Sequence, residues 1–218
     1  IKKEILKKKL QSKVINVNID FKNKNLGYTK NPYFFTKGNQ ENLAYILALS
    51  KKLKLDSKKL FKTINNFKGL KYRQQTIFKS KKLTVINDSK ATSFSSSLNI
   101  LKSLDKVYWI VGGVPKVGDQ FLMKKKECKN FSAYIFGDNR LFFIKQLKKK
   151  MKYQSFSNLD VLLKKIKKDI VSEKDHKHKT ILFSPAAASF DKFKNFEDRG
   201  ERFNLLIKSL KILKITHV

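Results

Sequence analysis

One stretch of the sequence indicates the fold of this chain more clearly than any other: Leu83-Thr84-Val85-Ile86-Asn87-Asp88-Ser89-Lys90-Ala91-Thr92-Ser93. It begins as a largely apolar run, typical of a buried strand, and continues as a polar loop that opens a helix. A carboxylate, an ammonium group and several hydroxyls thus follow directly on a strand. Because ligands of open α/β sheets bind at the carboxyl ends of the strands, this loop is a candidate binding site.

The chain has 218 residues, of which 41% are hydrophobic, enough for one large domain or for one domain and part of another. No apolar stretch approaches the ~20 residues that a membrane helix needs, and the N-terminus lacks the apolar core of a secretory signal. Because the chain begins with Ile1 and not Met, we expect a piece of a longer protein or a processed one. Cys128 is the only cysteine, so no disulfide forms within the chain, which suits a reducing compartment.

The formal net charge of +33 admits two interpretations. Neutralisation of phosphates by lysines would predict a basic nucleic-acid-binding module. We favour the other interpretation, a general enrichment in lysine over an ordinary globular surface, because arginine, the usual reader of bases and phosphates, is scarce. The lysines also spread over nearly every polar helix face and form no single stripe. A positive field would still attract anionic substrates such as nucleotides.

The first third of the chain predicts part of a domain. Residues 14–21 alternate apolar and polar side chains, as an exposed strand does, and a helix is expected from Gly38 to Leu55 with Asn39 as its cap. A second helix, capped by Asp56, ends at Gly69. We place a domain boundary at 68–72, so that residues 1–70 form an incomplete α/β domain and residues 71–218 a second domain.

The second domain predicts an α/β fold: a Rossmann-like, mostly parallel sheet with helices on both faces. A hairpin is expected to pair 74–78 with 83–87. Further strands are expected at 107–112, 132–136, 153–156 and 180–184. Helices are expected at 92–104, 119–129, 139–150, 159–173 and 197–214. The carboxyl edge of this sheet would gather four loops, at 87–92, 112–119, 137–140 and 184–196.

Two of these loops offer groups that bind anions. Asp88 suits a ribose hydroxyl or a metal-bound water, Lys90 a phosphate or carboxylate, and Thr92 an anion at a helix start. The alternative is a plain helix cap formed by Ser89 or Thr92. In the next loop, Lys116 is a candidate positioned cation, although the same residues also suit a mere turn.

The last of the loops, 184–196, carries small residues, the hydroxyl of Ser189, and aromatic side chains that would wall a pocket, including Phe196. The alternative is a hydrophobic lid on the last helix. A Ser-His-Asp hydrolase is not indicated, because no Gly-x-Ser-x-Gly elbow is present. His176 and His178 lie in a charged loop without cysteines and make a poor metal site.

Taken together, the loops resemble the C-terminal domain of the Mur ligase family, in its D-glutamate-adding branch. The matching residues are Asn87 to Thr92; Gly112, Gly113, Lys116 and Asp119; and Ser184 to Ala186, Ser189, Asp191, Phe193 to Glu197, Arg199 and Gly200. Upstream, Gly38 to Asn42 and Gly69 to Arg73 resemble the end of the family's central ATP-binding domain.

The resemblance implies a cytoplasmic, monomeric, ATP- and Mg²⁺-dependent amide ligase of peptidoglycan precursor synthesis. ATP would phosphorylate the terminal carboxylate of UDP-N-acetylmuramoyl-L-alanine, and the amine of D-glutamate would attack the acyl phosphate. By resemblance, the nucleotide contacts are Asn42, Arg73, Asp88 and Lys90. By the same resemblance, D-glutamate would be held by Thr92, Lys116, Ser189 and the backbone near Phe196. No specific nucleic acid and no membrane is implied as a partner.

The departures from the family concern nucleotide binding. The Gly-rich phosphate loop, the Mg²⁺ ligands and the UDP-binding domain have no counterpart among these residues; Tyr72 stands where His is usual, and Asn39 where His-Asn is common. We therefore expect the chain to be inactive alone and to be a fragment of the ligase. A remnant that binds an amino acid without ligating it remains an alternative, as does, less favoured, the nucleic-acid module.

Overall fold

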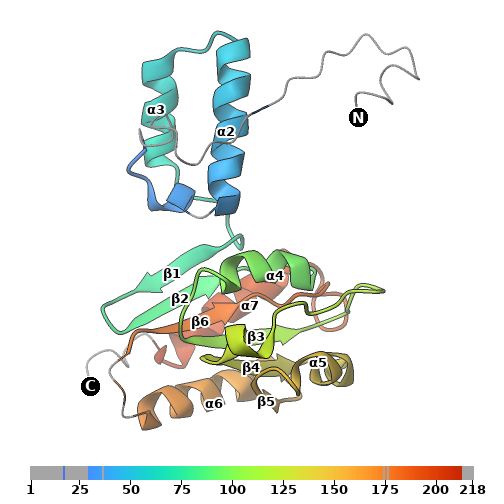
Figure 1. The fold of residues 1–218 in the computed structure, drawn as a ribbon. Helices are drawn as coiled ribbons and strands as arrows, with labels where there is room; N and C mark the ends of the chain where they lie inside the picture. The colour runs from blue at the N-terminus through green and yellow to red at the C-terminus, as the bar shows by residue number, and fades with distance from the viewer. Residues whose placement is uncertain (1–16, 18–28, 36, 174, 176, 213–218) are drawn as a thin grey trace, which may run out of the picture. The chain divides into compact units, whose positions relative to one another are not determined.

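The computed structural model describes residues 17, 29–35, 37–173, 175 and 177–212 (Figure 1). They fall into two compact units that divide between Lys68 and Gly69, and each unit is described here by itself. The strand expected at 14–21 lies outside the described residues except for residue 17, and His176 and His217 also lie outside them.

The described part of the first unit is helical. It contains η2 (Pro32–Phe35), α2 (Lys37–Lys52) and α3 (Ser57–Asn66). The expected cap of α3 is confirmed, because the Asp56 carboxylate accepts a hydrogen bond of 2.7 Å from the backbone N–H of Lys59. The expected cap of α2 is wrong: Asn39 lies inside that helix. Its side-chain amide donates to the Tyr33 carbonyl at 2.7 Å, which η2 brings within reach.

The second unit is built on a six-stranded sheet in the order β1-β2-β6-β3-β4-β5 (Figure 1). The strands are β1 (Gln75–Lys79), β2 (Leu83–Asn87), β3 (Val107–Gly112), β4 (Phe131–Phe136), β5 (Lys152–Ser155) and β6 (Lys179–Phe183). All neighbours are parallel except β1, which pairs with β2 as the expected antiparallel hairpin. The strand β6, the last in the part of the chain that the structure describes, therefore lies between β2 and β3, and the loops after all three meet.

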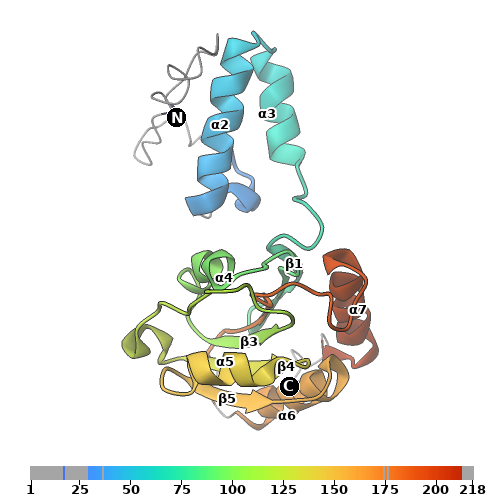
Figure 2. The same cartoon turned by 90° about the vertical axis from the view of Figure 1, so that its right-hand side faces the viewer.

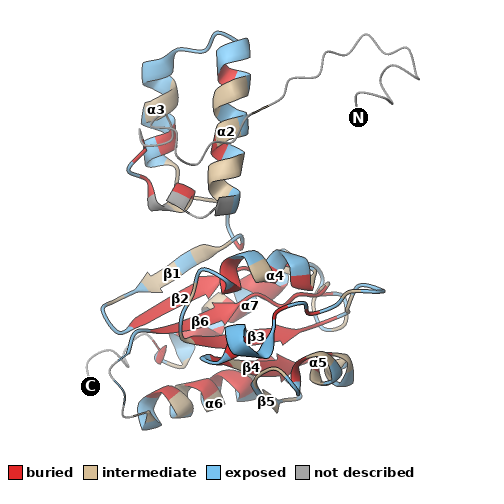
Figure 3. Ribbon diagram, in the orientation of Figure 1, coloured by how far each residue is buried: buried red, intermediate tan, exposed pale blue. Residues whose placement is uncertain are grey.

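Helices cover both faces of this sheet (Figures 2 and 3). They are α4 (Phe94–Leu101), α5 (Arg140–Leu147), α6 (Leu159–Ser172) and α7 (Phe196–Ser209). Buried side chains of α4 and α5 share one apolar cluster, and those of α6 and α7 share another on the opposite face. The predicted fold class, a mostly parallel α/β sheet with helices on both faces, is confirmed.

The helix expected at 119–129 is wrong. Only the 3-10 helix η3 (Lys125–Cys128) forms there, and residues 119–124 before it form no helix or strand. Phe121 and Met123 are buried while Leu122 between them is 71% exposed, so the side chains alternate with the period of a strand. Burial of these two side chains outweighs the helix propensity of the lysines that follow.

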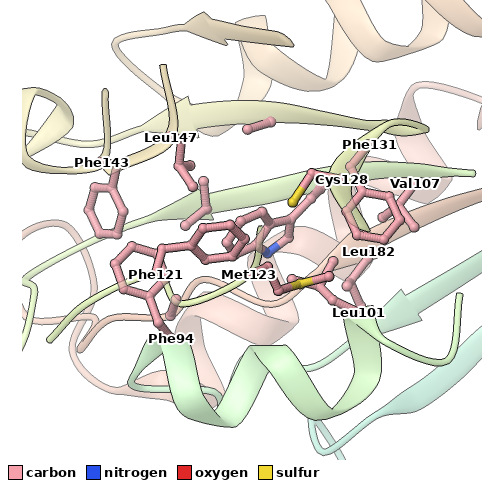
Figure 4. Close-up of a cluster of buried hydrophobic side chains, with 14 of the residues drawn as sticks. Phe94, Leu101, Val107, Phe121, Met123, Cys128, Phe131, Phe143, Leu147 and Leu182 are labelled. Atoms are coloured by element: carbon pink, nitrogen blue, oxygen red, sulfur yellow. The ribbon is translucent and has the colours of Figure 1, made fainter. Parts of the chain in front are cut away.

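Aromatic rings fill the core on the α4 and α5 face (Figure 4). The Phe94 ring contacts those of Trp109, Phe121 and Phe143 at centroid distances of 6.2, 5.5 and 5.8 Å. Cys128 is buried in the same cluster, and burial raises the pKa of its thiol to about 11. The thiol is therefore a packing group and not a nucleophile.

Replacement of Phe94 by Ala should lower the free energy of unfolding by roughly 3–5 kcal/mol, because the ring is fully buried and its loss leaves a cavity. Phe190 is 75% exposed, so Phe190→Ala, the same chemical change, should cost no more than about 0.5 kcal/mol. Urea unfolding of both variants measures the difference. Equal losses would contradict the assignment of Phe94 to the core.

Candidate functional site

Three loops meet at the carboxyl edge of the sheet: the first loop (88–93) after β2, the second loop (113–119) after β3, and the third loop (184–195) after β6. The second and third are joined by a pair of backbone hydrogen bonds of 2.9 Å between Val114 and Ala188. The second is joined to the start of α4 by the Asp119 carboxylate, which accepts from the Phe94 N–H at 2.7 Å. Three of the four loops that were predicted to converge are thus joined, and the fourth, 137–140, is linked to the third by the ion pair of Asp138 with Lys192 at 2.9 Å.

Gly113 permits the close approach of the second and third loops. Its φ is +128°, and a Cβ atom placed on it would lie 2.3 Å from the carbonyl oxygen of Ala188. Only glycine adopts this conformation without strain, and no larger residue fits the space. The Gly-Gly pair of the sequence is therefore explained by contact between backbones.

Asp88 is nearly fully buried at the end of β2. One carboxylate oxygen accepts from the Gln74 N–H at 3.0 Å and the other from the Ser184 hydroxyl at 2.8 Å. Burial raises the pKa of this carboxyl from 3.8 to about 6, and the two hydrogen bonds and the charge of Arg73 oppose the rise only in part. A buried carboxyl with such a pKa at the ends of the strands is a candidate functional group.

Ser184 extends the contacts of Asp88 into the core. Its hydroxyl also lies 2.7 Å from the Ser97 hydroxyl, and its carbonyl accepts from the Trp109 indole N–H at 2.8 Å. Ser184, which follows β6 and lies 96 residues from Asp88, matched the family pattern, but we assigned it no role from the sequence. Its signals were that match and its place at the end of a buried strand.

Arg199 is the other buried charge of the site, with an exposure of 0%. Its guanidinium donates to the carbonyls of Ser89 and Ala187 at 2.7 and 2.9 Å and to the Ser89 hydroxyl at 3.1 Å. Burial lowers the pKa of this guanidinium to about 10, and the charge of Asp191 opposes the fall. Arg199 thus ties α7 to the first and third loops.

Arg199 matched the family pattern, but we assigned it no role from the sequence. Its signal was a positive charge on the inward face of α7, in helical register with Phe196 and Phe203. A second link to α7 lies nearby. The Asn87 amide at the end of β2 donates hydrogen bonds to the Gly200 carbonyl and the Asn204 side chain, each at 2.8 Å.

The start of α7 faces the first loop. The Lys90 ammonium lies 4.1 Å from the centroid of the Phe196 ring, a cation–π contact, and the Phe196 carbonyl accepts from the Ser89 hydroxyl at 2.8 Å. The first turn of α7 is capped by Asn195, which accepts from the Asp198 N–H. Lys90 and Phe196, which the resemblance assigned to different substrates, are therefore neighbours.

Tyr72, the departure from the family pattern, anchors the segment before β1. Its hydroxyl donates to the Glu201 carboxylate at 2.7 Å, and this contact, with burial, raises its pKa to about 12. Its carbonyl accepts from the Lys90 N–H at 3.0 Å, and its ring packs on Gly200, where a Cβ would lie 2.4 Å from it. The tyrosine therefore has a structural role between the first loop and α7.

The remaining predicted residues are placed as follows. Ser189 is buried in the third loop, and Thr92, Lys116 and Arg73 are exposed. The cap of α4 is Ser93, so neither Ser89 nor Thr92 caps that helix, and the cap alternative for them is wrong. Asn42 lies on α2, in the other unit.

Metal-binding groups are sparse in the part of the chain that the structure describes. No group of three or more His, Cys, Asp or Glu side chains there could hold a metal ion. Both ring nitrogens of His178 have partners within the chain: Nε2 lies 2.9 Å from the Thr84 hydroxyl, and Nδ1 lies 3.0 Å from the Lys81 carbonyl. Nor does any described helix have the length and apolar character needed to cross a membrane.

The fold and the three loops define a domain of the Mur ligase type. MurF from Acinetobacter baumannii superimposes with a TM-score of 0.56 at 14% identity, covering 80% of this chain and 38% of that one. UDP-N-acetylmuramate-alanine ligase MurC from Thermotoga maritima gives 0.51 at 17% identity over 80% and 38%. At these identities, the likeness concerns the fold alone. No family model matches the chain.

Sequence relatives identify the branch. The UDP-N-acetylmuramoylalanine–D-glutamate ligase of Rickettsia prowazekii is 38% identical over 170 residues, which are 78% of this chain and 38% of the relative. That of Wolbachia sp. subsp. Brugia malayi is 32% identical over 209 residues, 96% of this chain and 41% of the relative. The chain belongs to the Mur ligase family and is a homologue of its D-glutamate ligases. It spans less than half the length of these curated relatives.

The raised pKa of Asp88 predicts a pH dependence of stability. The folded chain binds this proton more tightly than the unfolded chain, so the stability contributed by the group is full below pH 3.8 and is lost as the pH rises through about 6. The loss amounts to about 3 kcal/mol by neutral pH. Asp88→Asn cannot ionise and should lose about that much less than the wild type between pH ~4 and ~7.5.

Urea unfolding of both proteins at several pH values measures this difference, since the other titrating groups are common to both. Parallel stability curves for the wild type and Asp88→Asn would contradict a raised pKa at Asp88.

Proposed function

We propose that residues 69–212 form the D-glutamate half of a ligase that adds D-glutamate to UDP-N-acetylmuramoyl-L-alanine in peptidoglycan precursor synthesis. The observation that carries the proposal is the joining of three loops at neighbouring strand ends. Asp88 and Arg199 tie the first loop to the third, and Val114 pairs with Ala188 between the second and the third. The homology to D-glutamate ligases over most of the chain supports it.

The chemistry of these loops suits a small dicarboxylate. D-Glutamate presents two carboxylates and one amine, and it needs cations and hydrogen-bond donors at fixed separations. Lys116 offers a cation from the second loop, Ser189 a hydroxyl from the third, and Thr92 a hydroxyl from the first. The backbone N–H groups at the start of α7, near Phe196, favour negative charge.

For the nucleotide, we propose contacts from Arg73, Asp88 and Lys90 in this unit and from Asn42 in the first unit, which we infer to be the end of a central ATP-binding domain. Asp88 is buried and already accepts two hydrogen bonds, so it is suited to orient a ribose hydroxyl rather than to move freely. Lys90 lies over Phe196 and would neutralise charge near the phosphates. Catalysis in such a site comes mainly from positioning and charge stabilisation.

ATP would transfer its terminal phosphoryl group to the substrate carboxylate and leave as ADP, and Mg²⁺ would offset the charge of the phosphates. The described residues offer no group of side chains that fits Mg²⁺, so we derive no step through the metal. The sequence contains no Gly-rich phosphate loop ending in Gly-Lys-Ser/Thr, and we propose that the chain by itself forms no ADP. The expected setting is the cytoplasm, with small molecules as partners.

The purified chain should bind D-glutamate in preference to L-glutamate, measured by isothermal titration calorimetry. Lys116→Gln and Ser189→Ala should each weaken binding about tenfold, because each removes one hydrogen bond to a charged carboxylate, worth about 1.5–3 kcal/mol. Lys124→Gln, the same change at an exposed lysine before η3, should leave the affinity unchanged. Equal affinity for both enantiomers, or no effect of the two site variants, would contradict the proposal.

A further inference from the structure

The proposed function leaves the lysine content of the chain unexplained, and seven of the lysines line one cleft in the second unit. A cleft of about 1500 Å³ opens at the amino ends of β3, β4 and β5. This edge of the sheet is opposite to the one that carries the three loops. Figure 2 shows β4 and β5 beside α5.

Lysines from separate segments line this cleft. They come from η3 and the residue after it, from the connection between α5 and β5, and from the start of β5: Lys125, Lys126, Lys129, Lys148, Lys149, Lys150 and Lys152. The Lys150 ammonium is used internally, since it donates to the carbonyls of Phe121 and Met123. The other six side chains have no ion pair or side-chain hydrogen bond with any described residue.

The carboxylates in the lining do not offset this charge. Asp169 is paired with Lys165 and accepts from the Tyr134 hydroxyl at 2.6 Å. Glu173 is paired with Lys106 and lies 3.8 Å from the Lys179 ammonium. Both acids are therefore neutralised by lysines outside the lining, and the cleft keeps an excess of positive charge.

A buried donor also lines the cleft. The Tyr108 hydroxyl is buried and faces the Glu173 carboxylate, without a hydrogen bond of normal geometry to any described residue. Burial and the nearby Glu173 carboxylate raise its pKa well above the usual value, so the hydroxyl keeps its proton. This proton is available to an acceptor oxygen of a bound ligand.

We propose that this cleft binds a linear chain of phosphate groups of the inorganic polyphosphate kind. The lysines are clustered, unpaired and set around a cleft, so they suit a dense, flexible polyanion that can enter it. A flat anionic surface would reach only the rim of the cleft. Bases would find little to stack on, because Tyr153, 40% exposed, is the one exposed aromatic residue in the lining, which also contains no arginine. Recognition is by charge, independent of the D-glutamate site.

Binding of a short inorganic polyphosphate to the full chain, followed by calorimetry over a range of salt concentrations, tests this proposal. The triple variant Lys148→Gln, Lys149→Gln, Lys152→Gln should reduce the slope of log K against log salt by about 2–3, because each phosphate contact contributes ~0.7–0.9. The matched control is Lys58→Gln, Lys59→Gln, Lys62→Gln on α3, which removes the same charge from exposed positions. It should leave the slope nearly unchanged.

If the two triple variants change the slope equally, binding depends on the overall charge of +33 and the proposal is overturned. The proposal is also overturned if neither variant changes the slope. Tighter binding of oligothymidylate than of polyphosphate with equal charge would also overturn it. D-Glutamate binding should be the same in both triple variants. Its measurement therefore tests the proposed function separately from the polyphosphate proposal.

Discussion

The guanidinium of Arg199 is buried where the first loop, the third loop and α7 meet, and the site depends on its contacts. It donates to two backbone carbonyls and one hydroxyl, on residues 110 and 12 positions away in the chain. A buried charge without such partners would cost several kcal/mol, so the loops are held where they satisfy it. The Ser89 hydroxyl, which accepts from Arg199, donates in turn to the Phe196 carbonyl at the start of α7.

The two edges of the sheet differ in their charged groups and in the room that they leave for a ligand. At the carboxyl edge, Gly113 lets two backbones touch, and Asp88 is buried with a pKa near 6. The groups left exposed there, such as Lys116 and Thr92, come from the same loops and are suited to a small dicarboxylate. At the amino edge, unpaired lysines surround an open cleft that suits a larger anion.

The sheet and its candidate site were predictable where the determinants are local. An apolar run followed by polar residues predicted β2 and its loop, and alternating strands and helices predicted the parallel sheet. The links across the site were not predictable, since Ser184 meets Asp88 only after β6 inserts between β2 and β3. The helix expected at 119–129 failed for a related reason: its buried residues contact a core assembled from distant strands.

The most direct test of this account is amide hydrogen exchange of the wild type and of Arg199→Met, which keeps much of the side-chain volume and removes the donors. Protection should fall together in the first loop and in the third loop, while β4 and β5 keep theirs. Arg202→Met, on the same helix at an exposed position paired with Asp160, is the control and should leave both loops unchanged. Loss of protection in one loop alone, or in neither, would contradict the claim that Arg199 holds the two together.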